Sequence, residues 1–205
     1  MTGRPVDHLV YAVADLDAAI DDFERGLGVR PGAGGQHPGR GTHNALAALG
    51  AGCYLELIAP DPAQPDPELG RPFRVDTTGA PRLAGWALRC TDLDAAVSKA
   101  RSLGFDPGDP FEMHRTTVAG DELLWRLTPP STGAFPFLID WGDTAHPSVS
   151  APNGLRLVTF RIEDPDPSPI AAALAALGAD VEVVAAEQPS LVAVIDGPGG
   201  RTELR

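Results

Sequence analysis

Two polar side chains stand in segments that otherwise have the pattern of apolar strands. Glu56 lies within the run YLELI at residues 54–58, and His8 opens the run HLVYAV near the N-terminus. A carboxylate that faces inward from an apolar strand needs a hydrogen-bonding partner or a cation. An imidazole and a carboxylate are also half of a reasonable ligand set for a divalent metal. These residue types indicate either a metal centre or a hydrogen-bonded polar pair inside a pocket.

More polar side chains gather in and just after a glycine-rich segment, Arg30 to Gly41. Glycine lets the backbone approach a ligand closely, because it has no Cβ. Thr42 and Asn44 share one face of the strand expected after this segment, whereas His43 points the other way. We select His37, Thr42 and Asn44 as candidates for contact with a ligand. The competing interpretation is that residues 30–41 form a solvated connecting loop.

Residues 113–116 and 124–126 have the pattern of two paired strands. His114 and Arg115 are neighbours there, so they point to opposite faces and one of them can line a cleft. An arginine in a cleft suits a carboxylate or phosphate on a ligand. Trp86, in the apolar run LAGWAL, is a candidate for a pocket wall, although core packing is the commoner use of such a tryptophan. We take His114, Arg115 and Trp86 as ligand-binding candidates.

The chain carries no motif of nucleophilic catalysis. It has no Gly-x-Ser-x-Gly or Ser-x-x-Lys, and neither Cys53 nor Cys90 has a histidine beside it in the sequence. The formal net charge is −12 and the basic residues are scattered, which argues against nucleic acid or a membrane surface as a partner. No segment approaches the ~20 apolar residues of a membrane span, and no signal peptide is visible. We therefore expect a cytoplasmic protein that handles a small-molecule ligand.

The elements that would position these residues repeat along the chain. Aligning DLDAA at residues 15–19 with DLDAA at residues 92–96 brings the preceding apolar runs into register. A weaker third copy runs from Leu155 to Val181. Each copy predicts a strand, an Asp at a helix N-cap, an amphipathic helix ended by glycine, and then two or three strands. The expected fold is α+β and is built from repeated βαβββ modules.

Connectors rich in proline separate these modules at residues 59–72 and 143–153. The predicted boundaries are residues 1–142 for a pair of modules, with module one at 5–60 and module two at 82–142, and residues 153–205 for a smaller third module. A lone third module leaves a sheet edge without a partner in its own chain, and such an edge favours pairing with a second copy. We therefore predict a homodimer.

The repeated units resemble the vicinal-oxygen-chelate superfamily, the group of glyoxalases, dioxygenases and bleomycin-resistance proteins. The runs DHLVYAVADLDAA and YLELIAP carry this resemblance. More narrowly, GGQHPGRGTHNALAALGAGCYLELIAPDP, followed by LLWRLTPP, FPFLIDW and HPS, is similar to a bacterial glyoxalase-like domain family. The resemblance spans nearly the whole chain and implies that modules one and two form an open half-barrel around a cleft. It does not define the reaction, because the superfamily contains isomerases, dioxygenases, fosfomycin-modifying enzymes and drug binders.

The resemblance also implies where a metal would be held, since the superfamily takes ligands from the first and last strands of each module. In module one these positions are His8 and Glu56. In module two the repeat places Gly85 opposite His8, and we expect Asp140 as the counterpart of Glu56. The implied set for Zn, Fe, Mn, Ni or Mg is thus His8, Glu56 and Asp140, one ligand short because glycine has no ligand atom. The candidates to complete it are His37, His43 and His114.

Three functions compete at this point. A metal-dependent lyase, isomerase or dioxygenase would hold two adjacent substrate oxygens on the ion, with Glu56 or a pocket histidine such as His37 moving the proton. A metal-free protein would bind and sequester a small, partly aromatic molecule, as bleomycin-resistance relatives do. An assembly protein would have a vestigial cleft. His8 and Glu56 favour the first function, Gly85 favours the second, and the polar cluster at residues 37–44 disfavours the third.

Overall fold

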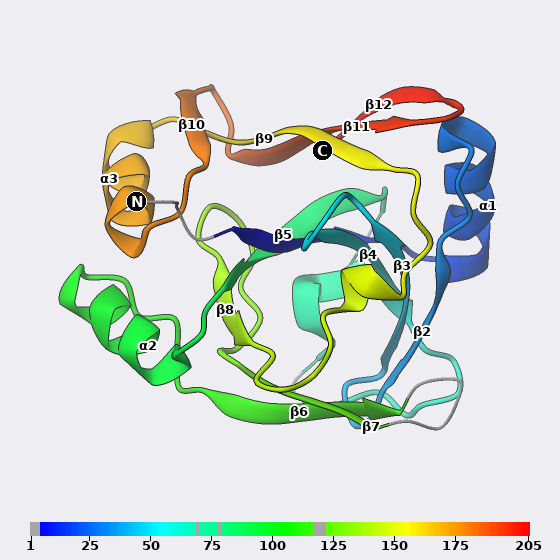
Figure 1. Cartoon of the computed structure of the whole chain (residues 1–205), viewed down its shortest axis with the longest axis horizontal. Coiled ribbons are helices and arrows are strands. Elements are labelled where there is room, and N and C mark those ends of the chain that lie inside the picture. The colour runs from blue at the N-terminus through cyan, green and yellow to red at the C-terminus, as the bar shows by residue number, and fades with distance from the viewer. Residues whose placement is uncertain (1–4, 69, 78, 117–121) are drawn as a thin grey trace.

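A curved eight-stranded sheet, with a smaller four-stranded sheet packed on its convex side, makes up most of the molecule (Figure 1). The computed structural model describes residues 5–68, 70–77, 79–116 and 122–205. The strand order of the large sheet is β2-β3-β4-β1-β5-β8-β7-β6. The predicted α+β half-barrel of two βαβββ modules is confirmed.

Module one has the predicted strand–helix start and a capped helix. It comprises β1 (Val6–Ala12), α1 (Leu16–Leu27), β2 (Gly32–His37), β3 (Thr42–Ala48) and β4 (Tyr54–Pro60). Asp15 caps α1 by accepting a hydrogen bond from the Ala18 amide at 3.0 Å. Gly28 ends the helix at φ 74°, a left-handed conformation that favours glycine. The caps therefore define both ends of α1, as the sequence indicates.

Module two follows the same order of elements. It comprises β5 (Arg82–Arg89), α2 (Leu93–Ser102), β6 (Phe111–Thr116), β7 (Glu122–Leu127) and β8 (Phe137–Asp140). Asp92 caps α2 by accepting from the Ala95 amide at 2.9 Å. β1 and β5 pair antiparallel at the centre of the large sheet and so join the two modules. Short 3-10 helices lie in the two connectors, η1 at Pro72–Thr77 and η2 at Pro147–Val149.

Within the glycine-rich segment, residues 32–37 form a strand, whereas one interpretation of the sequence was a loop over all of residues 30–41. Gly32–His37 forms β2, which pairs with β3 at one end of the large sheet. Its glycines allow close packing: a Cβ at Gly34 would lie 2.0 Å from Asn44 Oδ1, and one at Gly32 would lie 2.9 Å from Pro152. Sequence composition suggested a flexible loop because glycine required by close approach looks the same as glycine in a turn.

The third unit has the predicted element order but a different strand pairing. It comprises β9 (Arg156–Asp164), α3 (Pro167–Leu177), β10 (Glu182–Ala185), β11 (Ser190–Gly197) and β12 (Gly200–Leu204). The order is β10-β9-β11-β12, so the first strand pairs in parallel with the strand that follows the helix. In module one the first strand instead pairs in parallel with the last strand, β4. The third unit therefore does not repeat the geometry that forms the cleft.

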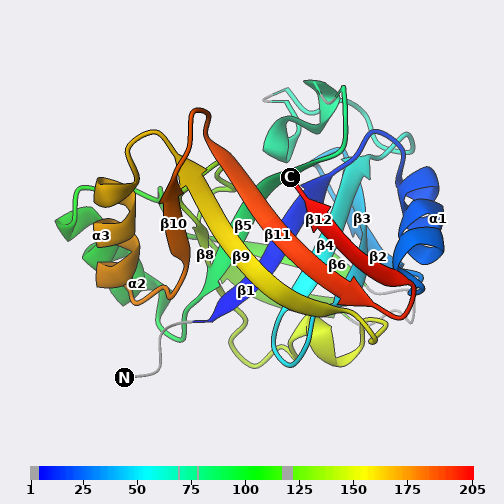
Figure 2. The same cartoon turned by 90° about the horizontal axis from the view of Figure 1, so that it is seen from above.

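The small sheet covers the outer face of the large sheet where β1 and β5 meet. Figure 2 shows β9 and β11 crossing over β1 and β5, with α1 at one side and α2 and α3 at the other. Leu9 and Trp86 of the large sheet share one apolar core with Ile162 and Ile195 of the small sheet. A second core fills part of the concave side. The concave face of the half-barrel is thus left to line a cleft.

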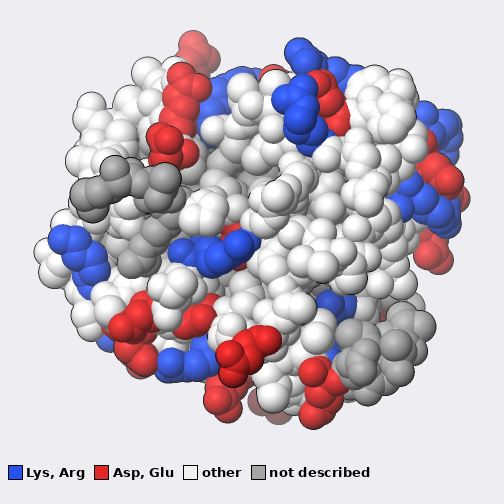
Figure 3. Space-filling view, in the orientation of Figure 1, with Lys and Arg blue, Asp and Glu red and all other residues white. Residues whose placement is uncertain are grey.

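The surface carries mixed charge. On the face shown in Figure 3, acidic and basic side chains are interspersed, and uncharged atoms cover much of the middle. Among the described residues, no helix combines the length and the apolar character that a membrane span requires. Within the described chain, the outer edges of β10 and β12 pair with no other strand, and the homodimer stays a prediction.

Trp86 offers a test of the packing between the two sheets. Its side chain is 0% exposed, and its ring lies 5.4 Å from that of Phe160. We expect Trp86→Ala to lower the free energy of unfolding by about 3–5 kcal/mol, because it leaves a cavity between the sheets. Urea denaturation measures the loss, with Trp125→Phe on the cleft side as the control. An alanine variant as stable as the wild type would contradict this packing.

Candidate active site

The concave side of the large sheet encloses an open cavity of about 670 Å³, a volume that includes solvent at its mouth. Its walls are mainly apolar and aromatic, with Leu46, Ile58, Phe73, Trp125, Phe137 and Trp141 among them. Among the described residues of the lining, the polar and charged side chains are His8, His37, Arg40, Asn44, Tyr54, Glu56 and Arg115. Such a mixture of apolar wall and few polar groups is typical of a small-molecule site.

Glu56 lies at the centre of the polar group. The alternation of β4 turns Tyr54, Glu56 and Ile58 toward the cavity. The Glu56 side chain is nearly buried, and its Oε1 accepts a hydrogen bond from Asn44 Nδ2 at 2.6 Å. The other carboxylate oxygen, Oε2, lies 3.7 Å from His8 Nε2. One oxygen is thus held by an amide, and the other faces an imidazole.

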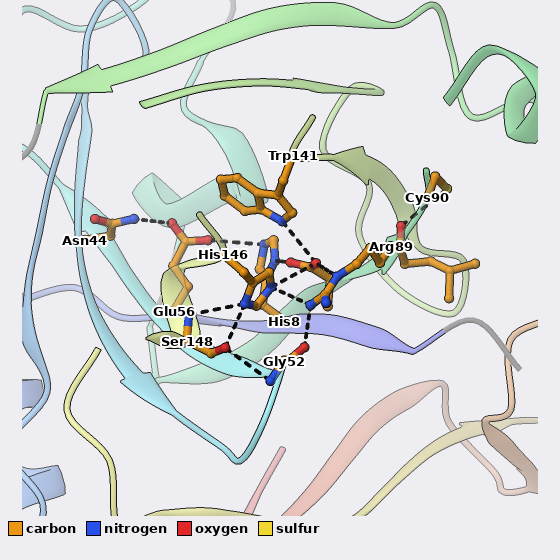
Figure 4. A network of polar contacts seen from close by, with 11 residues as sticks. His8, Asn44, Gly52, Glu56, Arg89, Cys90, Trp141, His146 and Ser148 are labelled. Atoms are coloured by element: carbon orange, nitrogen blue, oxygen red, sulfur yellow. Dashed lines mark hydrogen bonds and ion pairs between the residues drawn. The ribbon is translucent and has the colours of Figure 1, made fainter. Parts of the chain in front are cut away.

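Asp7 orients His8 from behind. Asp7 is 0% exposed, and its Oδ1 accepts from His8 Nδ1 at 2.8 Å. Its Oδ2 accepts from Arg89 Nε at 2.7 Å, from Trp141 Nε1 at 3.1 Å and from His146 Nε2 at 3.1 Å. Figure 4 shows His8, Arg89, Trp141 and His146 converging on this network, with Glu56 between His8 and Asn44. With Nδ1 committed to Asp7, His8 directs Nε2 to the cavity.

The Asp7 carboxylate stays ionised inside the protein. Burial by itself raises the pKa of this carboxyl group, but hydrogen bonds from His146 and His8 outweigh burial and hold the pKa well below its usual range. Sequence analysis did not select Asp7, Arg89 or His146. The available signal was an aspartate directly before His8 in an apolar strand, since such a group requires buried partners.

His37 stands behind Asn44 and lines the cavity. Its Nδ1 lies 2.9 Å from Thr42 Oγ1, and its Nε2 lies 3.1 Å from Asn44 Nδ2. Burial lowers the pKa of His37, and the nearby Glu56 carboxylate only partly opposes that effect. Thr42 is fully buried and meets the site through His37. The predicted trio of His37, Thr42 and Asn44 is therefore one hydrogen-bonded chain that ends at Glu56.

Of the two neighbouring candidates on β6, Arg115 faces the cavity and His114 is exposed. Arg115 Nη1 donates a hydrogen bond to the Gly34 carbonyl on β2, which links the two edges of the curved sheet. The structure does not bring Trp86 to the cavity, because it lies on the convex side and donates to the Ala134 carbonyl.

Asp140 also lies outside the cavity lining, since its neighbours Ile139 and Trp141 are the residues of this segment that face the cleft. Its Oδ1 accepts a hydrogen bond from the Gly142 amide at 3.0 Å. The counterpart of Glu56 is instead Phe137. In module one, Glu56 on β4 pairs with Val10 on β1. The repeat aligns Val10 with Ala87 on β5, and Ala87 pairs with Phe137 on β8.

Module two therefore offers no metal ligand at the two implied positions. Phe137 has no ligand atom, and a side chain at Gly85 would clash: its Cβ would lie 2.6 Å from the Ser131 carbonyl oxygen and 2.7 Å from the Phe73 ring. Among the described residues, no three His, Cys, Asp or Glu side chains are placed to hold a metal ion. The residues present do not fit the metal set that the resemblance implies.

Solved structures that share little sequence with this chain are similar to it, the first two of those below in overall fold. A hypothetical protein from Staphylococcus aureus is 13% identical, with 98% of each chain covered and a TM-score of 0.66. A mutant of 4-hydroxymandelate synthase from Streptomyces coelicolor is 17% identical over 100% of this chain and 63% of that one, with a TM-score of 0.50. Methylmalonyl-CoA epimerase from Mycobacterium tuberculosis is 25% identical over 70% of this chain and 91% of that one, with a TM-score of 0.47. No curated protein matches the sequence.

A half-barrel of two βαβββ modules around a cavity defines a protein of the vicinal-oxygen-chelate superfamily. The profile described as glyoxalase-like domain matches residues 6–178. The chain belongs to this glyoxalase-like domain family.

The metal content of the protein is the first prediction for this site. After dialysis against zinc, manganese or nickel and then against buffer, we expect the untagged protein to retain much less than one equivalent of metal. Elemental analysis measures it, with His8→Ala and Glu56→Ala in parallel. One retained equivalent that both variants lose would show that His8 and Glu56 bind a metal with ligands other than those implied.

The lowered pKa of His37 predicts a loss of stability in mild acid. In the unfolded chain the His37 imidazole has a pKa near 6.5. As the pH falls below that value, His37 takes up a proton in the unfolded state but not in the native state, so the free energy of unfolding falls. The slope from this group reaches about 1.4 kcal/mol per pH unit. Urea denaturation from pH 7.5 to 5 should show a steeper loss for the wild type than for His37→Gln. Equal slopes would contradict the prediction.

Proposed function

We propose that the cleft binds a small organic molecule and that Glu56 moves a proton on it. The observation that supports this most directly is the placement of Glu56. Among the described residues that line the cavity it is the one acid, and it stands nearly buried in a mainly apolar wall. A carboxylate in such surroundings is a reasonable general base, because little water competes for it.

The contacts around Glu56 give its two carboxylate oxygens different surroundings, and we assign them different roles. Asn44 holds Oε1, which leaves Oε2 beside His8 and the cavity. Asp7 in turn holds His8 through Nδ1, so the imidazole keeps one orientation. Glu56 and His8 are accordingly a positioned acid–base pair, and Asn44 and Asp7 are positioning residues.

The proposed step is the transfer of a proton from an activated carbon of the ligand to Glu56. The C–H bond breaks, its electron pair moves into an adjacent carbonyl group of the ligand, and the carboxylate becomes a carboxylic acid. Delivery of a proton to the opposite face of the same carbon completes an epimerisation. Where that carbon carries a hydroxyl group, delivery of the proton to the former carbonyl carbon, with transfer of the hydroxyl proton to the carbonyl oxygen, completes an isomerisation. His8 Nε2, at 3.7 Å from Oε2, is near enough to exchange that proton with Glu56 after a small movement.

A binding protein without catalysis is the second candidate. Gly85 and Phe137 stand at the implied ligand positions of module two, and this favours the second candidate. Phe137, and the Phe73 ring that packs against Gly85, give the cleft an apolar wall where an enzyme of this superfamily would hold a metal. In this case Glu56 would serve only to hydrogen-bond a polar group of the ligand.

Proton exchange distinguishes the two candidates. The protein is incubated in D2O with a set of small carbon acids, namely 2-oxo acids, 3-oxo esters and acyl thioesters, and loss of the C–H signal is followed by proton NMR. We expect the wild type to accelerate exchange of at least one compound, and Glu56→Gln to slow it by about 10²-fold or more. Glu182→Gln, at an exposed position on β10, is the matched control and should be unaffected.

The same samples report binding through saturation transfer from protein to ligand. Binding without exchange of any carbon acid would favour the second candidate. Exchange that persists in Glu56→Gln would remove Glu56 from the proposed role.

A further inference from the structure

Arg115 is a nearly buried cation that lies at the wall of the cavity. Its side chain is 7% exposed and lines the cavity. Among the described residues, the Gly34 carbonyl is the one group that accepts a hydrogen bond from it. A guanidinium group has five N–H donors. The donors that do not bond to Gly34 are available on the cavity side, where a ligand that supplies acceptors can form charge-assisted hydrogen bonds with them.

The charge of the cavity differs in sign from that of the whole chain. Its described lining includes two arginines, Arg40 and Arg115, against the single carboxylate of Glu56. The difference, two minus one, leaves one positive charge in excess, whereas the chain as a whole carries a formal charge of −12. A ligand with one negative charge would balance the excess that the protein places here.

The two arginines lie at different depths. Arg40 is exposed, and its guanidinium carbon lies 5.0 Å from the centroid of the Phe111 ring. Arg115 is deeper, and the Glu56 carboxylate partly offsets the burial that lowers the pKa of Arg115. Arg40 therefore suits attraction of an anion to the mouth, and Arg115 suits its final position beside Glu56.

We infer that the ligand is an amphipathic organic anion, with an apolar and partly aromatic body, whose oxyanion group is bound by Arg115. This inference rests on the proposed function, because it names the class of molecule on which Glu56 would act. The body packs against the aromatic wall formed by Phe73, Trp125, Phe137 and Trp141. Carboxylate, sulfonate and phosphate share the geometry that a guanidinium group binds with two parallel hydrogen bonds.

A pair of fluorescent probes tests this recognition on the whole chain. 8-Anilinonaphthalene-1-sulfonate carries an aromatic body and one negative charge, and N-phenyl-1-naphthylamine has the same rings without the charge. We expect the wild type to bind the sulfonate about tenfold or more tightly than the neutral probe. Leu46→Trp, which places a large ring in the cavity, should weaken both probes and so shows that they occupy the cleft.

Variants then assign the discrimination to one residue. Arg115→Met keeps most of the side-chain volume but loses the charge, and it should weaken the sulfonate about tenfold while leaving the neutral probe nearly unchanged. Arg115→Lys should recover part of the preference. Arg126→Met is the matched control, because Arg126 lies on the neighbouring strand β7 and pairs with Asp94 at the surface. It should leave both affinities unaltered.

The possible failures are distinguishable. Equal affinity of the wild type for the two probes would overturn anion recognition without touching the proposed binding function. An equal loss of both probes in Arg115→Met would also overturn it, since Arg115 would then only support the fold. If neither probe binds the wild type, the proposed binding function fails as well. Displacement of the bound sulfonate probe from the wild type by benzoate, benzenesulfonate or phenyl phosphate identifies the preferred oxyanion and needs no variant. Benzamide is the neutral control, and displacement by benzamide as effective as by the anions would count against the inference.

Discussion

The buried Asp7 carboxylate is the interaction on which the rest of the site depends. It joins His8 on β1, Arg89 on β5, Trp141 after β8 and His146 in the connector before the third unit. A buried charge with several donors is stable only while they all stay in place, and removal of one partner of such a group is strongly destabilising. Asp7 thus links both modules and a connector to one imidazole, and that imidazole faces Glu56.

Glycine has two opposite effects on the two modules. At Gly34 the missing side chain lets β2 approach Asn44, whose amide then holds Glu56. At Gly85 it lets the Phe73 ring and the Ser131 carbonyl fill the space that a metal ligand of module two would need. The two modules share a fold, but His8, Asn44 and Glu56 all come from module one. The cleft is therefore asymmetric: this polar group lies on one side, and an aromatic wall with Arg115 lies on the other.

The third unit contributes to this arrangement from the opposite face. Its sheet packs on β1 and β5, the strands that join the modules, and buries Trp86 and Leu9 between the layers. The small sheet thus covers the convex side at β1 and β5, and the concave side lines the cavity that contains Glu56. A single excess positive charge in that cleft, within a chain of formal charge −12, gives it an electrostatic character that the molecule as a whole lacks.

The repeated strand–helix units were predictable from the amino-acid sequence, because caps such as Asp15 and Gly28 and the alternation of apolar residues are local signals. The same alternation predicted that Thr42 and Asn44 share one strand face and that His114 and Arg115 point apart. Which face of each strand is concave depends on how the strands assemble in three dimensions. That assembly places Arg115 in the cavity and leaves Trp86 and Asp140 outside it. The Asp7 network and the contact of Gly85 with Phe73 also depend on the tertiary structure, because they join residues that are not neighbours in the sequence. No local sequence pattern indicates which distant segments come into contact.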